Sequence, residues 1–243
     1  MTALFIKEIN SFLTSIPGYI AMAVFLLTTS LFLWVFPNDF NILDFGYAQL
    51  DSLFIVAPYI FLFLIPSITM KSFAEENKTG TIELILTKPI TDLKIILAKY
   101  AASLVLFIIS LLPTIVYYIS VYQLGLPTGN IDSGGVIGSY VGLLFLGSVF
   151  ISIGLFASSI SNNQIIAFLV SVVLCGFLLI GFDFIYNFSI FGNFDLIIKS
   201  LGIMSHYTSI SRGVLDLRDL LYFVSATAVF IILTKMSIES RKW

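Results

Sequence analysis

The charged side chains of this sequence are few, and many of them lie in one run between residues 71 and 99. The run contains no histidine and no cysteine, the side chains on which acid–base and nucleophilic catalysis often depend. It connects two hydrophobic segments in a sequence that otherwise indicates only a membrane protein. We therefore expect this run to be the place where a soluble partner engages the chain.

Membrane spans are the elements that must position this run. The sequence is 58% hydrophobic and 11% charged, with a mean hydropathy of +1.04. No water-soluble domain could cover so much apolar surface with so few charges. A span requires about 20 largely apolar residues. Six such runs appear, at 19–36, 53–70, 100–122, 136–157, 164–182 and 220–235. The net charge of -2 leaves no basic stripe for a nucleic acid, so we expect no nucleic-acid partner.

The positions of the lysines and arginines predict how these spans are oriented, because basic residues beside spans are retained in the cytoplasm. If the N-terminus is inside, the outer segments hold only Lys199, Arg212 and Arg218. The bias predicts that both termini are cytoplasmic. The cytoplasmic basic residues are then Lys7, Lys71, Lys78, Lys88, Lys94, Lys99, Lys235, Arg241 and Lys242.

The interiors of these six runs contain no Asp, Glu, Lys, Arg or His, which argues against a proton-driven pump or a voltage sensor. The sequence also has no G-x-x-x-x-G-K-[ST] loop to cradle nucleotide phosphates. Energy for uphill transport would therefore have to enter from outside the chain. The single cysteine, Cys175, leaves no cysteine-based metal cluster, and we expect neither a metal nor a cofactor.

Residues 1–18 are predicted to form an amphipathic helix along the cytoplasmic interface. Lys7 and Glu8 belong to its polar side, and Pro17-Gly18 is predicted to turn the chain into the membrane. Two interpretations stay open, a surface anchor and part of a docking platform. The apolar side carries Leu4, Phe5, Ile9, Phe12, Leu13 and Ile16.

The charged run itself is predicted to contain a short helix. Gly80 breaks the helix that leaves the second span, and Glu83 favours the first turn of a new helix. Pro89 ends that helix, and Thr91 is a plausible N-cap for the next one. A solvated connection would explain the charges, but it explains the stop signals and the apolar ridge less well. One face carries an apolar ridge of Ile82, Ile85 and Leu86.

Two further features concern helix packing and the outer segment. Gly134, Gly138 and Gly142 recur every four residues, which allows close packing either within the subunit or across a dimer seam. Between residues 183 and 219, short helices are predicted to dip into the outer interface. We interpret the lone His206 as a surface residue, since no second histidine or carboxylate stands at metal-ligand spacing.

The charged run resembles the cytoplasmic signature of the ABC-2 type transporter permeases. The residues that carry the resemblance keep their order between the second and third of six spans, although Ala98 stands where many members have glycine. They are Glu75-Glu76, Gly80-Thr81-Ile82-Glu83-Leu84, Pro89 and Lys99. The stretch Ser211-Arg212-Gly213-Val214-Leu215-Asp216-Leu217-Arg218-Asp219 is similar to one subgroup, the gliding-motility type.

The resemblance implies an all-α polytopic protein in the bacterial inner (cytoplasmic) membrane, a single ABC-2 transmembrane domain over residues 1–243. It implies a separate cytoplasmic ATPase, a second permease copy or paralogue and, for the gliding-motility type, an auxiliary periplasmic membrane-anchored protein near residues 183–219. The chain itself would not be an enzyme. ATPase coupling is expected of Glu75, Glu76, Gly80, Thr81, Ile82, Glu83, Ile85, Leu86 and Pro89, and outer-segment roles of His206, Arg212, Gly213 and Asp216.

The sequence leaves two other classes of protein as alternatives. An intramembrane enzyme would need polar catalytic groups within or against the spans, and the sequence shows none that converge. A passive membrane scaffold stays open, because a coupling segment could recruit a partner without driving transport.

Overall fold

The computed structural model describes residues 2–44, 46–87, 90–188, 192, 195–213 and 216–240. Within these ranges the chain is helical and has no strand, as the sequence predicts. The helices, in chain order, are α1 Thr2–Leu13, α2 Ile16–Ser30, η1 Leu31–Val35, α3 Asp51–Thr69, α4 Lys71–Thr79, α5 Thr81–Leu86, α6 Asp92–Leu111, η2 Leu112–Thr114, α7 Ile115–Leu124, α8 Ser133–Ile160, α9 Gln164–Gly176, η3 Phe177–Gly181, α10 Phe182–Asn187, α11 Asp195–Leu201, α12 Ile203–Ser211 and α13 Leu217–Glu239.

Six helical stretches of the described chain are long and apolar enough to cross a membrane, which confirms the predicted number. Each stretch extends beyond its apolar run at one or both ends, and in four of the six the added residues include charged ones. The stretches are Ile16–Val35, Asp51–Thr79, Asp92–Leu124, Ser133–Ile160, Gln164–Asn187 and Leu217–Glu239.

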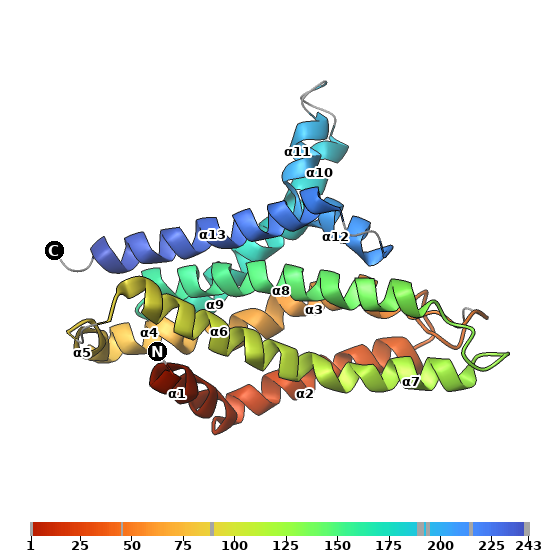
Figure 1. Cartoon of the computed structure of the whole chain (residues 1–243), viewed down its shortest axis with the longest axis horizontal. Helices are drawn as coiled ribbons and strands as arrows, with labels where there is room; N and C mark the ends of the chain where they lie inside the picture. Colours follow the sequence, from red (N-terminus) through yellow and green to blue (C-terminus); the bar gives the residue numbers. More distant parts are fainter. Residues whose placement is uncertain are drawn as a thin grey trace.

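The long helix α8 is the centre of the bundle and packs against α3, α4, α6, α9, α12 and α13 (Figure 1). Small residues allow these close contacts. The hydrophobic effect drives helices together only weakly inside a bilayer, so close van der Waals packing must stabilise their association. A Cβ atom on Gly147 would collide with Phe107 of α6, and one on Gly154 with Thr69 of α3. Helices α2, α9 and α13 stand at the periphery, where most of their residues face outward.

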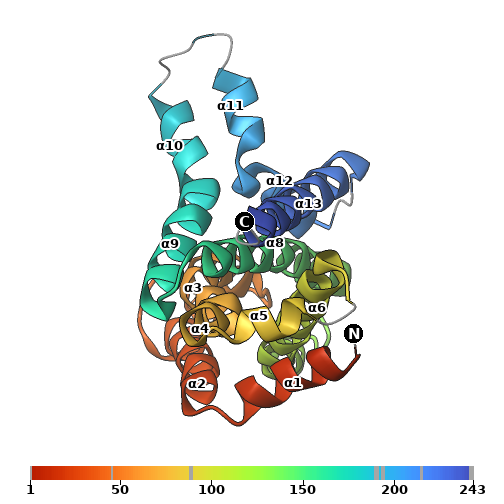
Figure 2. The ribbon, with the colours of Figure 1, turned by 90° about the vertical axis from the view of Figure 1, so that its left-hand side faces the viewer.

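Both α1 and the end of α13 lie at the same end of the bundle as α5 (Figure 1). We name this the α5 end, and the opposite end the far end. The segment α9–η3–α10 leaves the bundle sideways and returns through α11, so that α10 and α11 form a projecting hairpin (Figures 1 and 2). The π-helical turn η3 stands where this segment leaves the bundle; such turns are a common cause of helix bends.

The entry into the first span differs from the prediction. The chain turns at Thr14 and Ser15, not at Pro17-Gly18, and α2 already begins at Ile16. Ser15 is the N-cap, and its hydroxyl oxygen accepts a hydrogen bond from the Gly18 N–H at 3.3 Å. Pro17 fits the first turn, where its missing N–H has no intrahelical partner to lose.

Candidate coupling site

Four charged side chains meet at the α5 end, where α1, α4 and α6 come together; we name them the charge cluster. They are Lys7, Glu8, Glu76 and Lys99. The Lys99 Nζ atom lies 2.8 Å from Glu8 Oε1 and 3.0 Å from Glu76 Oε2. One ammonium group of α6 therefore holds a carboxylate from each of two other helices.

Lys99 is fully buried, with a side-chain exposure of 0%. Its ammonium also donates to the carbonyl oxygen of Ser72 at 2.6 Å and lies 4.9 Å from the centre of the Phe73 ring. Removing charges from water costs several kcal/mol per ion, and only good geometry with partners for every donor offsets that cost. The Glu8 carboxylate and the Ser72 carbonyl accept hydrogen bonds from the ammonium, while Glu76 adds a close ion pair and the Phe73 ring a cation–π contact.

Lys7 extends the cluster toward solvent. Its ammonium lies 2.9 Å from Glu76 Oε1 and 3.9 Å from Glu8 Oε1. Burial lowers the pKa of Lys7, but the hydrogen bond that its ammonium donates to Glu76 and the charges of Glu76, Glu8 and Glu75 outweigh it, so the pKa lies above the ordinary lysine value. The ammonium form of Lys7 therefore persists across the neutral range.

This cluster corrects one expectation from the sequence and shows a burial that the sequence did not predict. Lys99 lies in α6, the helix predicted to begin after Thr91, on the buried face with Ile95 and Ala102. Glu8 was assigned to the polar side of the first helix, but it is half-buried and faces Lys99. The spacing carried a signal, because Glu8 stands four residues after Leu4, an apolar residue that packs on the core.

Hydrogen bonds from α8 fix the other side of α4. The Ser158 hydroxyl accepts from the N–H groups of Phe73 and Ala74 at 3.0 Å each, and it donates to the Met70 carbonyl at 3.0 Å. This hydroxyl occupies the break between α3 and α4, where it takes the place of bonds within a continuous helix. The Asn77 amide donates to the carbonyl oxygens of Ser159 and Ser161. Thus α4 is clamped between the charge cluster and α8.

The charged run beyond α4 has the predicted break and short helix. Gly80 adopts a left-handed conformation with φ of 70°, which ends α4, and α5 follows at once with Glu83 in its first turn. Thr91 is the N-cap residue of α6, although its hydroxyl makes no capping bond. Ile82 is half-buried against the core. The side chains of Ile85 and Leu86, and Pro89 as a whole, lie outside the described residues.

Described polar side chains within and before α5 reach solvent. Glu75, Thr81 and Glu83 are exposed, whereas the neighbouring Glu76 is buried in the cluster. The adjacent carboxylates of Glu75 and Glu76 thus have different roles, one facing solvent and one facing Lys99.

Of the three glycines at the start of α8, two lie in close contact with another part of the chain. A Cβ on Gly138 would lie 2.9 Å from the Cα of Gly213, and one on Gly142 would lie 3.2 Å from Ile210 Cγ2. Both therefore allow the end of α12 to approach α8 within one chain. A Cβ on Gly134 would meet only the Asp132 carboxylate, at 3.4 Å.

His206 is not the surface residue that the sequence suggested. Its side chain is 17% exposed, and its Nδ1 atom lies 2.7 Å from Asp219 Oδ1. Its Nε2 atom lies 2.8 Å from the Ser200 carbonyl oxygen, and its ring stacks on Tyr222 with 4.0 Å between centroids. The histidine joins α11, α12 and α13. Among the described residues no group of three potential ligands could hold a metal ion.

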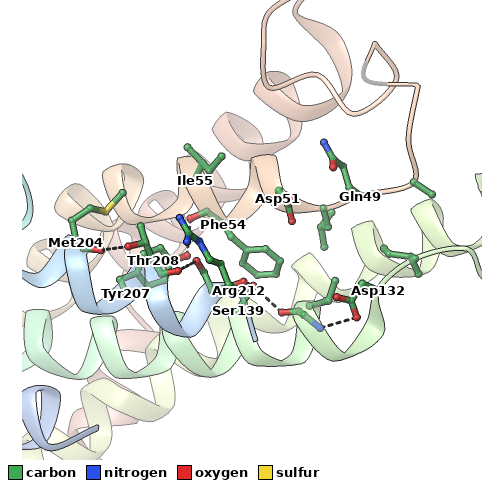
Figure 3. Close-up of a pocket in the computed structure, with 16 residues that line it drawn as sticks. Gln49, Asp51, Phe54, Ile55, Asp132, Ser139, Met204, Tyr207, Thr208 and Arg212 are labelled. Atoms are coloured by element: carbon green, nitrogen blue, oxygen red, sulfur yellow. Dashed lines mark hydrogen bonds between the residues drawn. The ribbon is translucent and has the colours of Figure 1, made fainter. Parts of the chain in front are cut away.

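The other predicted residues of the outer segment do not form one site, and each has a different structural role. Gly213 has φ of 81° and turns the chain beside α8. Asp216 is the N-cap of α13, where its carboxylate accepts from the Arg218 N–H at 3.0 Å. Arg212 is exposed and lines a pocket at the far end (Figure 3).

Comparison with known proteins identifies the family. The family model described as "ABC-2 family transporter protein" matches residues 2–239, nearly the whole chain. No curated protein matches the sequence. Six spans and a short helix between the second and third agree with the permease resemblance of the sequence. The chain therefore belongs to the ABC-2 family of transporter proteins, and it is a multi-pass membrane component and not the ATPase.

Proposed function

We propose that this chain is a permease subunit that couples ATP hydrolysis by a separate cytoplasmic ATPase to export or to another task across the membrane. The α5 end faces the cytoplasm in this proposal, and both termini with it. The segment from Glu75 through α5 to Pro89 docks on the ATPase. The observation that supports this most strongly is the buried charge cluster directly behind that segment.

The cluster explains how a push on α5 would reach the membrane. Helix α5 follows α4 with only Gly80 between them. Helix α4 is bound to α6 and α1 through Lys99, and to α8 through Ser158. A displacement of α4 therefore moves the second and third spans together. Sliding α4 alone would strand a charge in a buried site, which costs about 3–5 kcal/mol.

The cluster also gives α1 a role beyond anchoring. Glu8 joins α1 to Lys99, and Lys7 joins it to Glu76. Helix α1 leads within two residues into the first span. The first span is therefore linked to the same block as the second and third, and we propose that α1 belongs to the moving coupling unit.

We further propose that the transporter is of the gliding-motility type, and that the chain is similar to GldF, the permease of that transporter. The support is sequence resemblance in Trp34-Val35-Phe36, Asn41-Ile42-Leu43, Leu84-Ile85-Leu86-Thr87-Lys88-Pro89 and the 211–219 stretch. The complex would contain a second permease copy or paralogue in the bacterial inner membrane. The projecting hairpin of α10 and α11, with Phe184, Phe188 and Leu196 exposed, is where an auxiliary periplasmic protein would bind.

ATPase stimulation tests the coupling role. The chain is purified with the ATPase encoded beside it, and hydrolysis is measured in lipid vesicles for Gly80→Pro and Glu83→Ala. A proline cannot adopt the positive φ of Gly80. We expect Gly80→Pro to abolish stimulation and Glu83→Ala to lower it about tenfold, as for a central contact residue.

The matched control is Glu239→Ala, which removes an exposed carboxylate at the same end and should leave hydrolysis unchanged. If no ATPase co-purifies, or if hydrolysis ignores both α5 variants, the chain is a scaffold and the proposal is wrong.

A further inference from the structure

A pocket of about 490 Å³ opens at the far end of the bundle, opposite the coupling site. Three parts of the chain line it, namely the start of α3, the start of α8 and the last turns of α12 (Figure 3). The Tyr207 hydroxyl donates to the Phe54 carbonyl at 2.6 Å, and the Ser139 hydroxyl donates to the Ser211 carbonyl at 2.7 Å. These bonds join α12 to α3 and α8, so the walls of the pocket are fixed.

The pocket presents one positive and one negative group from opposite walls. Arg212 extends from the end of α12 toward α3, and Asp51 begins α3 (Figure 3). Neither side chain has a hydrogen bond or ion pair to another described residue. Asp132 also lines the pocket, but its carboxylate accepts from the N–H groups of Gly134 and Gly135. The charges left for a ligand are therefore a guanidinium and a carboxylate.

The depth of the pocket matches that of lipid headgroups. Asp51 is the first residue of the second membrane span, and Asp132 directly precedes the fourth. From Asp51 an apolar stripe continues along the same face of α3 at four-residue spacing. Its members Ile55, Tyr59 and Phe63 are 47%, 44% and 57% exposed. A charged pocket thus leads without interruption into an exposed apolar surface of the span.

We propose that this pocket binds the phosphoethanolamine headgroup of a phospholipid from the leaflet at the far end. Arg212 pairs with the phosphate, as guanidinium groups do in a fork-like geometry. Asp51 accepts hydrogen bonds from the primary ammonium, and an acyl chain lies along Ile55, Tyr59 and Phe63. Choline has no N–H to donate to Asp51. The anionic headgroup of phosphatidylglycerol has no cation that could pair with Asp51.

This proposal rests on the proposed function only for which leaflet, inner or outer, supplies the lipid. The site itself involves no residue of the α5 end. The lipid measurement below uses no ATPase. The two proposals can therefore fail separately.

The test is intact-mass spectrometry of the purified chain, released from micelles that contain equal amounts of dioleoyl phosphatidylethanolamine, phosphatidylcholine and phosphatidylglycerol. The chain should retain phosphatidylethanolamine in preference to the other two by about tenfold, as one charge-assisted hydrogen bond would give. Asp51→Asn should abolish the preference over phosphatidylcholine. Arg212→Gln should lower retention of all three lipids about tenfold.

Two controls match the charge changes outside the pocket. Asp44→Asn removes an exposed carboxylate of the preceding loop, and Arg218→Gln removes an exposed guanidinium of α13. Both should retain the preference, and its loss in either would mean a general charge effect and overturn the proposal. Equal retention of the three lipids by the unchanged protein would also overturn it. Soluble glycerophosphoethanolamine should not displace the lipid; displacement at similar concentration would assign the pocket to a soluble zwitterion instead.

Discussion

Lys99 donates a hydrogen bond to Glu8 at 2.8 Å, across 91 positions of the sequence. The bond joins the helix before the first span to the helix of the third span, with Glu76 of the second span completing the contact. Three membrane spans are thus tied at one buried point directly behind the segment proposed to meet the ATPase. Substitutions at this point and around it have distinct expected effects.

Lys99→Met should destabilise the protein strongly. Methionine approximates the shape of the lysine stem, but Glu8 and Glu76 would then face a buried site without their cation. The expected loss in unfolding free energy is about 3–5 kcal/mol, measured by thermal or denaturant unfolding in lipid nanodiscs. The matched control is Lys94→Met, an exposed lysine five residues earlier on α6, which should change stability by less than about 0.5 kcal/mol. Equal effects of the two variants would show that the cluster has no special energetic role.

Ser158→Ala should weaken the junction between α3 and α4. It removes the acceptor for two N–H groups and the donor for the Met70 carbonyl, all at a buried position. We expect a loss of about 1–3 kcal/mol, together with faster amide hydrogen exchange at Phe73 and Ala74. Ser152→Ala is the control, because its equally buried hydroxyl donates to the Val149 carbonyl of its own helix and should matter little. Unchanged exchange at Phe73 and Ala74 would contradict the role given to Ser158.

The start of α8 offers a pair of glycines with opposite expected outcomes. Gly138→Ala would place a Cβ 2.9 Å from the Cα of Gly213, so the end of α12 must shift, at a cost of about 1–3 kcal/mol. Gly134→Ala would meet only a carboxylate oxygen at ordinary distance, and the lower backbone entropy of alanine should leave stability unchanged or slightly higher. The free energy of unfolding is measured for both variants. Similar losses of stability at the two positions would be inconsistent with this packing.

His206→Phe should loosen the connection of α11 and α12 to α13. Phenylalanine keeps a ring to stack on Tyr222 but cannot bond to Asp219 or to Ser200, so the expected loss is about 1–3 kcal/mol. Asp219→Asn tests the partner in a double-mutant cycle, in which two bonded groups show effects that do not add. Additive effects in the cycle would mean that the two side chains act independently.

Much of the fold follows from sequence because its causes are local. Span number follows from apolar runs of sufficient length, and Gly80 marks the end of α4 because glycine tolerates a positive φ. The break at Met70 had no such mark. It depends on a hydroxyl of α8, which is 88 positions away.

The charge cluster escaped prediction for a related reason. Sequence spacing shows which face of a helix a residue occupies, but not which helix that face meets. Lys99 stands beside an apolar span like any interfacial lysine, and its burial depends on carboxylates of α1 and α4. The carboxylate partner of His206, Asp219, likewise lies on another helix, 13 positions along the chain.

The central claim is that the charge cluster transmits movement of the docked segment to the spans. Its most direct test is ATP hydrolysis by the assembled permease and ATPase in lipid vesicles, compared among Glu8→Gln, Lys99→Met and Lys94→Met. Glu8→Gln keeps the contacts of Lys99 with Glu76 and Ser72. It therefore provides the test if the Lys99→Met variant does not assemble with the ATPase. The account predicts that the cluster variants still co-purify with the ATPase but lose about tenfold or more of its stimulation, while Lys94→Met resembles the unchanged protein. Full stimulation in an assembled Glu8→Gln or Lys99→Met complex would contradict it.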